Sequence, residues 1–131
     1  MNKELQERIK TSTFEVVGPV VYVKVAKAPD IGKHFMVSKD KDEITVITRP
    51  ENLKHLDVIE KNKDIWSLIA LNVSAPFYSV GFLATVTSAI AKSGMNVLVV
   101  STYSKDYIMV TVKNVEKSKK ILISLGFKQA S

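Results

Sequence analysis

The chain has 131 residues, of which 46% are hydrophobic and 24% are charged, with five glycines, four prolines and no cysteine. This length suits one ordinary domain or two small ones that share a core, and the composition excludes collagen-like and generally disordered chains. The lack of cysteine excludes disulfide scaffolds, cysteine-ligated metals and thiol catalysis. No apolar run approaches the ~20 residues of a membrane span, and the charged first ten residues do not resemble a secretory signal. We therefore expect a cytoplasmic protein without a membrane partner.

The net charge of +6 is unevenly distributed along the chain. Residues 1–64 are close to neutral, whereas residues 65–131 carry seven lysines against only Asp106 and Glu116. A basic helix could attract phosphate or an acidic partner, although a solvated helix face is the more ordinary interpretation of such a run. Five of these lysines fall near one expected helix: Lys113, Lys117, Lys119, Lys120 and Lys128.

The first half of the chain predicts a short helix followed by strands. Residues 3–10 have helical spacing, and Gly18-Pro19 predicts a turn before a strand over 20–25. Strands are expected over 35–38 and 43–48, joined by the polar residues 39–42, and then a short helix or irregular crossing over 51–64. A boundary near residue 63 divides the chain into an N-terminal half, 1–63, and a C-terminal half, 64–131.

The second half has a clearer β-α-β-β-α order. Strands are expected over 66–73, 96–102 and 107–112, and helices over 79–93 and 115–125, with Asn114 as N-cap and Gly94 and Gly126 as helix ends. This order predicts an α+β, ferredoxin-like plait with two helices on one face of the sheet, in which residues 127–130 are too short for a convincing fourth strand. A strand from the first half could complete the sheet.

Both faces of the expected sheet are apolar. Ile69, Leu71, Val73, Ile108, Val110 and Val112 would face the helices. The opposite positions nevertheless carry Trp66, Leu68, Ala70, Tyr107 and Met109. An apolar face of this kind needs a cover, either from the N-terminal half or from a second copy of the chain. We expect self-association, as a dimer, with an intramolecular cover as the alternative.

Several segments of the second half resemble ACT domains, which sense amino acids in metabolic enzymes. The resemblance lies in Val80-Gly81-Phe82-Leu83-Ala84 and in Ile90-Ala91-Lys92-Ser93-Gly94-Met95-Asn96-Val97. Ser101-Thr102-Tyr103 and Asp106-Tyr107-Ile108 are similar to an S-T-Y-x-x-D-Y-I element of small tandem ACT-like proteins and of aspartokinase-type regulatory regions. The resemblance covers residues 65–125 and extends faintly into the first half, which implies a more divergent ACT-like half over 1–63 and an ACT domain over 64–131.

This resemblance implies a non-catalytic regulatory module that binds a small ligand, an amino acid, between ACT units. A helix N-terminus offers unpaired N–H groups to a carboxylate, and a glycine permits close approach. The candidate ligand-binding residues are Asn72, Ser74, Val80, Gly81, Phe82, Leu83, Asn96, Ser101, Thr102 and Asp106. Each also has a structural interpretation, as a packing glycine, a cap or a turn former. Many ACT domains carry an acid three residues before the glycine, where this chain has Tyr78. This departure suggests an altered ligand, a site closed by Phe77 and Tyr78, or a module that has kept only its dimerising role.

Enzymatic functions find little support in the sequence. His34 and His55 lack metal-ligand spacing, and no phosphate-binding glycine loop occurs, so we expect no metal, no cofactor and no catalytic residues. RNA-recognition domains share the plait, but their third strand needs several aromatic residues, and residues 106–110 offer one aromatic together with an acid. The sequence predicts a ligand-sensing module, with an assembly scaffold that has lost its ligand, or a basic-face nucleic-acid binder, as the alternatives.

Overall fold

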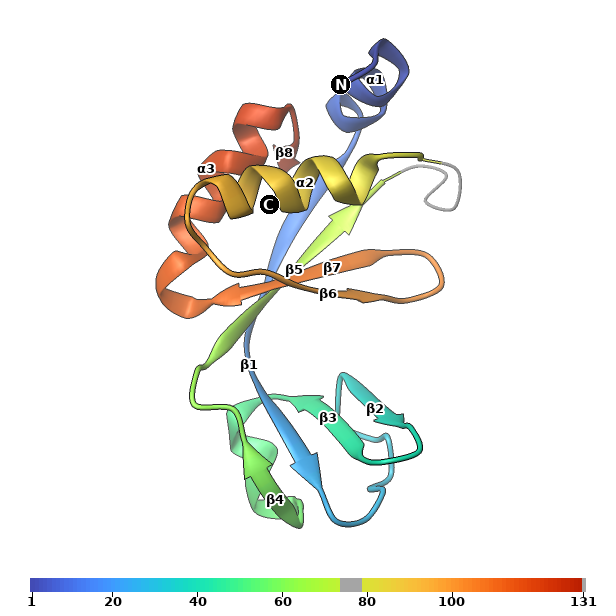
Figure 1. The fold of residues 1–131 in the computed structure, drawn as a ribbon, viewed down its shortest axis with the longest axis vertical. Coiled ribbons are helices and arrows are strands. Elements are labelled where there is room, and N and C mark those ends of the chain that lie inside the picture. Colours follow the sequence, from blue (N-terminus) through green and yellow to red (C-terminus); the bar gives the residue numbers. More distant parts are fainter. Residues whose placement is uncertain (74–78, 131) are drawn as a thin grey trace. The chain divides into compact units, whose positions relative to one another are not determined.

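The computed structural model describes residues 1–73 and 79–130. Figure 1 shows the elements in chain order. The helices are α1 (Lys3–Lys10), α2 (Phe82–Lys92) and α3 (Val115–Leu125), with single-turn 3-10 segments η1 (Pro50–His55) and η3 (Val112–Asn114). The strands are β1 (Thr13–Val25), β2 (Met36–Lys39), β3 (Ile44–Thr48), β4 (Val58–Lys61), β5 (Trp66–Asn72), β6 (Leu98–Ser101), β7 (Asp106–Thr111) and β8 (Lys128–Gln129).

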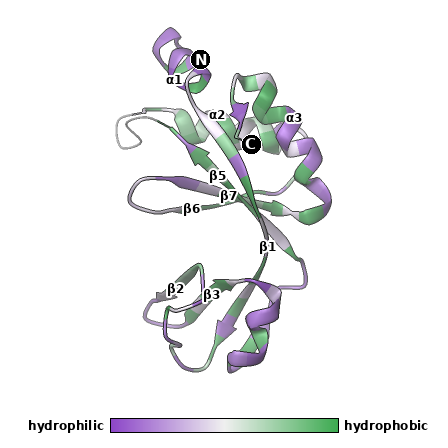
Figure 2. Cartoon of the chain, turned by 180° about the vertical axis from the view of Figure 1, so that it is seen from behind, coloured by the Kyte–Doolittle hydropathy of each residue, from purple (hydrophilic) through white to green (hydrophobic). Residues whose placement is uncertain are grey.

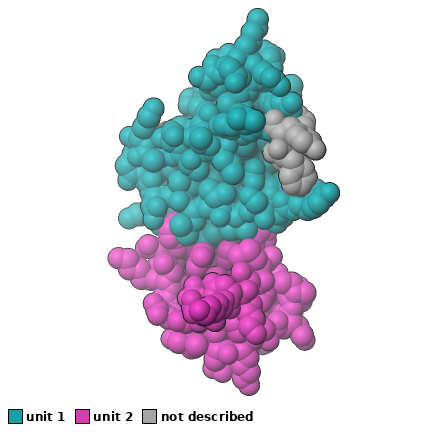
Figure 3. Space-filling view, turned by 45° about the vertical axis from the view of Figure 1, so that its right-hand side comes forward, with its two compact units in different colours: residues 1–18, 67–131 teal, residues 19–66 magenta. Residues whose placement is uncertain are grey.

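The chain forms two compact units, coloured separately in Figure 3. Unit 1 comprises residues 1–18 and 67–131, and unit 2 comprises residues 19–66. The N-terminal helix and the start of β1 therefore group with the C-terminal segment. The expected ACT-like halves over 1–63 and 64–131 concern a structural repeat, which this grouping by contacts does not test, so that division stays a prediction.

Unit 1 has the predicted α+β plait. Its strands follow the order β1-β5-β7-β6, with β8 parallel to β1 on the far side of β1. The N-terminal strand thus completes the sheet, and the last residues add a short further strand. β6 and β7 form an antiparallel hairpin in which Leu98 lies opposite Met109 and Ser101 opposite Asp106.

One apolar core joins the helices to the sheet of unit 1. Figure 2 shows hydrophobic residues along one side of α3 and hydrophilic residues along the other. Burying such stripes removes apolar surface from water, at about 25 cal/mol per Å². The core takes side chains from all three helices and from three strands: Leu5, Ile9, Phe14, Ile69, Leu71, Phe82, Val86, Ile90, Ile108, Val110 and Leu122.

Helix boundaries follow from local chemistry. Asn2 caps α1, since its Oδ1 accepts a hydrogen bond from the Leu5 amide at 2.8 Å. Gly126, with φ +117°, ends α3, and the Phe127 amide donates to the Leu122 carbonyl oxygen at 3.1 Å. Asn114 occupies the N-cap position of α3, but its side chain donates to Thr111 Oγ1 at 3.0 Å and makes no cap bond.

Unit 2 is a small antiparallel sheet with one 3-10 turn. β3 pairs with β1 and with β2, and β4 pairs with the other side of β1. The predicted 39–42 connection is confirmed as a tight turn, in which the amides of Asp42 and Glu43 donate to Asp40 Oδ1 at 2.8 and 2.9 Å. The apolar core of this unit consists of Val21, Val23, Val25 and Val46.

Three predictions of local structure were wrong. Gly18-Pro19 lies inside β1 and not in a turn before it, which the strand tolerates because pairing of β1 with β3 begins only at Val21. Val112 leaves the sheet in η3 and is 47% exposed, so it does not face the helices. The crossing over 51–64 contains β4, whose four residues are exposed and show no alternation that would mark a strand.

Three residues on the outer face of the C-terminal sheet are buried. Leu68, Ala70 and Met109 are 1%, 2% and 0% exposed. The sequence argument for self-association required these side chains to be bare in a monomer. A dimer and an intramolecular cover both stay predictions for this face.

Candidate ligand site at the start of α2

The first turn of α2 has the backbone geometry of an anion-accepting helix start. Gly81, at the N-cap, has φ +83° and makes no side-chain cap bond. The Phe82 amide donates to the Ser79 carbonyl oxygen, and the Thr85 amide donates to the Gly81 carbonyl oxygen. Within the described part of the chain the structure gives no partner to the amides of Leu83 and Ala84, and the first turn carries no acid. These two N–H groups can donate hydrogen bonds to a negatively charged group.

Gly81 is required by its conformation and not by close packing. A Cβ at this position would lie 3.7 Å from Leu5 Cδ2, which is an ordinary contact. Its positive φ is instead a conformation that side chains other than glycine adopt at a cost. A β-branched replacement such as Gly81→Val would strain the helix start itself, so it cannot serve as a clean test of binding.

The side chains that follow Gly81 have structural roles. Phe82 is 3% exposed and packs edge-on against Phe127, with ring centroids 5.7 Å apart. Leu83 is half-buried against the same core, whereas Val80 is 88% exposed. Phe82 and Leu83 therefore contribute backbone rather than side chains to any site here, and Val80 offers an apolar contact at the rim.

Helix α1 supplies charged side chains beside this turn. A hollow of about 80 Å³ lies between α1 and the residues before α2, and its lining is Asn2, Glu4, Leu5, Arg8, Ser79 and Val80. Arg8 Nη2 lies 3.5 Å from Glu4 Oε1, with 27% and 79% of the two side chains exposed. Sequence reasoning missed these residues because they lie some seventy positions from the motif; the Glu4-Arg8 spacing of four on one helix face was the available signal.

The hairpin residues of the predicted site hold their own turn. Ser101 Oγ donates to Asp106 Oδ1 at 2.5 Å, and the Thr102 amide donates to the Lys105 carbonyl oxygen at 2.8 Å. Figure 1 shows the β6–β7 turn at the same end of the sheet as the start of α2. In the strand order, β7 separates β6 from β5, so Ser101 and Thr102 lie about 10 Å to the side of β5, whereas Asp106 begins β7, the strand next to β5.

Asn72, Asn96 and Ser74 complete the predicted site. Asn96 follows the C-terminal end of α2, at the opposite end of the sheet from the start of that helix, and its Oδ1 accepts from the Val97 amide. Asn72, at the end of β5, is half-buried and donates to Thr13 Oγ1 at 3.3 Å. Ser74 lies outside the described residues, as does Tyr78, which stands where many ACT domains have an acid.

Two searches of the described residues gave negative findings. Over residues 1–73 and 79–130 no three histidine or acidic side chains gather closely enough to hold a metal ion. In the same part of the chain, none of the helices has the length and apolar character needed to cross a bilayer.

Comparison with solved structures defines the class of fold. A Vibrio cholerae protein of unknown function, described as a possible transport protein, superposes with a TM-score of 0.80 at 22% identity, over 95% of this chain and 97% of that one. An Agrobacterium tumefaciens protein gives 0.65 at 17% identity, over 91% and 92%. The ligand-free regulatory subunit of aspartate kinase from Thermus thermophilus gives 0.61 at 8% identity, over 84% and 97%.

The fold is thus the ferredoxin-like, ACT-type α+β fold of aspartate kinase regulatory domains. Residues 62–124 match the family model of the ACT domain. The predicted family and fold class are confirmed. No curated protein matches the chain in sequence. The family and its regulatory neighbours support a regulatory ligand-binding module as the general class of function.

Proposed function

We propose that this chain is a regulatory module that binds an amino acid at the α2 end of its ACT domain and responds through the packing of ACT units. The observation that carries the proposal is the hollow beside the α2 start, where a guanidinium and a carboxylate line the same small space. Asn72, Ser101, Thr102 and Asp106 are proposed as further ligand contacts, with Ser74 and Asn96 retained from the sequence prediction.

The charges around the hollow complement those of a free amino acid. Such a ligand carries a carboxylate and an ammonium on one carbon. The Arg8 guanidinium and the amides of the first turn of α2 suit the carboxylate, and Glu4 suits the ammonium. The Arg8–Glu4 pair is partly exposed, and exposed pairs contribute only about 0–1 kcal/mol. Breaking this ion pair to form contacts with a ligand therefore costs little free energy.

The size of the hollow limits what it can hold. Its volume of about 80 Å³ compares with about 30 Å³ for one water in the liquid. The α-carbon, carboxylate and ammonium of an amino acid fit, but a larger side chain must extend beyond the rim. Residues outside the hollow must then recognise that side chain. We propose that a second ACT unit supplies these residues. A ligand that contacts both units favours the packed arrangement of the two, which is a population shift.

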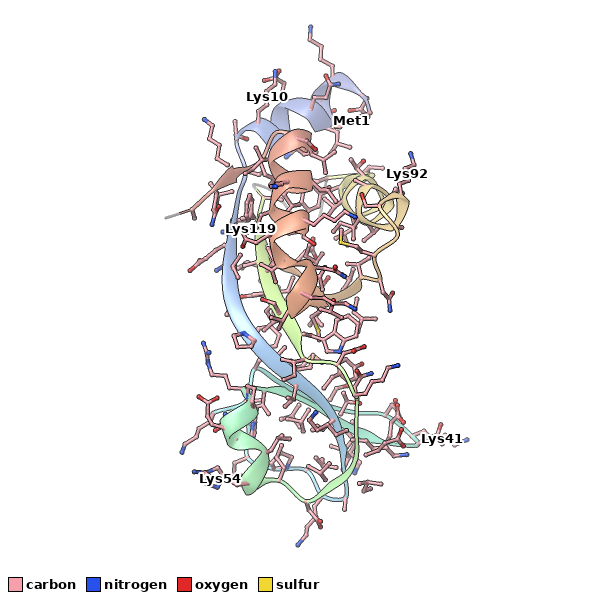
Figure 4. All side chains as sticks on the ribbon, turned by 90° about the vertical axis from the view of Figure 1, so that its left-hand side faces the viewer. Met1, Lys10, Lys41, Lys54, Lys92 and Lys119 are labelled. Carbon is pink, nitrogen blue, oxygen red and sulfur yellow. The ribbon has the colours of Figure 1, made fainter. Side chains whose placement is uncertain are left out.

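A thermal-shift screen of the standard amino acids tests this proposal. Ligand at about 100 times its Kd adds about 2.7 kcal/mol to the free energy of unfolding. Arg8→Gln and Glu4→Gln should each weaken the response. Lys10→Gln is the matched control, since Lys10 lies on the same helix with 67% of its side chain exposed and only a 3.8 Å pair to Glu7 (Figure 4).

Two results would contradict the proposal. Either no amino acid raises the unfolding temperature, or a hit binds the Arg8→Gln and Glu4→Gln variants as tightly as it binds the control. The unfolding temperature of each variant without ligand must be measured as well, so that a loss of response is separated from a loss of fold.

A further inference from the structure

A second hollow lies in unit 2 and shares no residue with the site described above. It has a volume of about 380 Å³ and is open to solvent. It is formed by the connection between β1 and β2 and by the end of η1. Its lining is Pro29, Asp30, Gly32, Lys33, His34 and His55, and we call it the histidine hollow.

A buried hydrogen-bond network behind the histidine hollow fixes the ring of His34. His34 Nδ1 lies 2.8 Å from Thr48 Oγ1, and Asn52 Nδ2 donates to the same oxygen at 2.9 Å. Thr48 and Asn52 are 0% and 8% exposed, so neither has access to bulk water. Asn52 Nδ2 also reaches the Lys33 carbonyl oxygen at 3.5 Å, which ties the loop to η1.

This network decides which ring nitrogen of His34 carries the proton. With the amide orientation assigned to Asn52, Thr48 Oγ1 accepts from that side chain. The hydroxyl proton of Thr48 then has one acceptor within reach, which is His34 Nδ1. A buried hydroxyl without an acceptor is costly, so Nδ1 acts as acceptor and the ring proton lies on Nε2. Because Nδ1 faces Thr48, Nε2–H lies on the opposite edge of the ring. His34 is itself one of the residues that line the hollow.

We propose that the histidine hollow binds a small oxyanion, either a phosphate or a carboxylate group. The His34 Nε2–H is a donor held in place by buried partners, and the Lys33 ammonium supplies positive charge beside it. The backbone turns at Gly32, where the His34 amide donates to the Ile31 carbonyl oxygen at 2.7 Å, and Lys33 and His34 both line the hollow. Asp30 also lines this hollow, and its carboxylate repels an anion.

The chain offers a direct readout for this proposal. It contains two histidines, His34 and His55, and both line the histidine hollow. The imidazole region of an NMR spectrum of the full chain therefore reports on this place alone. Inorganic phosphate and acetate are titrated separately at fixed pH, with sodium chloride at matched ionic strength as the reference. Saturable movement of the imidazole signals with phosphate, acetate or both is the expected result. The anion that saturates at the lower concentration identifies the preferred group.

Variants at the rim separate a specific site from general charge attraction. Lys33→Gln should weaken binding by about tenfold, as expected when a charged hydrogen bond is lost. Asp30→Asn should tighten it by about twofold, because a nearby like charge is removed. Lys41→Gln is the matched control, since Lys41 is an exposed lysine of the same unit, in the β2–β3 turn (Figure 4), and should leave binding unchanged.

Three outcomes would overturn the proposal. The imidazole signals could follow chloride as closely as phosphate and acetate, or move without saturation. Alternatively, Lys33→Gln could bind as tightly as Lys41→Gln. A fourth such outcome is a weaker affinity of Asp30→Asn for phosphate or acetate, because removing a nearby negative charge should not weaken the binding of an anion. None of these results bears on the amino-acid site of unit 1.

Discussion

The buried hydroxyl of Ser118 provides a sharp test of the packing of α3 in unit 1. Ser118 is 0% exposed, and over the described residues its Oγ has no hydrogen-bond partner. An unsatisfied buried polar group costs about 1–3 kcal/mol, and alanine is a better helix former than serine by a few tenths of a kcal/mol. Ser118→Ala removes one atom and leaves a void smaller than a methyl group. We therefore expect it to raise the free energy of unfolding by about 1 kcal/mol or more.

The matched control is Ser124→Ala, on the same helix. Ser124 is exposed, and its Oγ donates to the Ile121 carbonyl oxygen at 2.7 Å. Both changes alter helix propensity equally, so the difference between them isolates the buried hydroxyl. Urea unfolding followed by circular dichroism gives the two free energies, and for a chain of this length 1 kcal/mol corresponds to about 4 °C in melting temperature. If Ser118→Ala is no more stable than Ser124→Ala, the hydroxyl has a partner and the reasoning is wrong.

Three further predictions concern the supports of the two sites. Leu5→Ala should lower the free energy of unfolding by about 2–4 kcal/mol, because Leu5 is 5% exposed in the core of unit 1; a loss below 1 kcal/mol in urea unfolding would contradict this. Gly81→Ala should cost about 1 kcal/mol from its positive φ alone, and an unchanged melting temperature would show that the helix start relaxes. Thr48→Val should cost about 2 kcal/mol, because Asn52 loses its buried acceptor, and should shift the His34 signals in NMR; unaltered signals would reject the network.

The sequence predicted the second half of the fold well because its helices and strands carry strong local signals. The spacing of apolar residues and the helix-ending glycine predicted residues 115–125, which are the observed bounds of α3. The first half was harder, since β4 has no alternation and β1 continues through a Gly-Pro pair that normally marks a turn. Pairing of β8 with β1 joins residues more than a hundred positions apart, and local patterns carry no information about such contacts.

The sequence predicted only those parts of the candidate site that belong to a recognisable sequence motif. The backbone around Gly81 was identified through its resemblance to ACT domains, and two amides of that turn have no partner among residues 1–73 and 79–130. Arg8 and Glu4 were missed because α1 reaches the start of α2 through tertiary packing, which motif spacing cannot reveal. Asp106 was predicted as a ligand contact from its charge, yet its carboxylate accepts from Ser101 within the turn.

The edge of the sheet offers a second place for self-association, besides its face. β6 stands at the end of the strand order in unit 1, and Val99 on it is 40% exposed. An exposed strand edge invites a second chain, and a lysine there blocks such pairing. If ligand-dependent packing uses this edge, Val99→Lys should keep the chain monomeric in sedimentation experiments with ligand present. Ile123→Lys is the control, since Ile123 is 53% exposed on α3. Equal dimer formation by both variants would remove β6 from the mechanism.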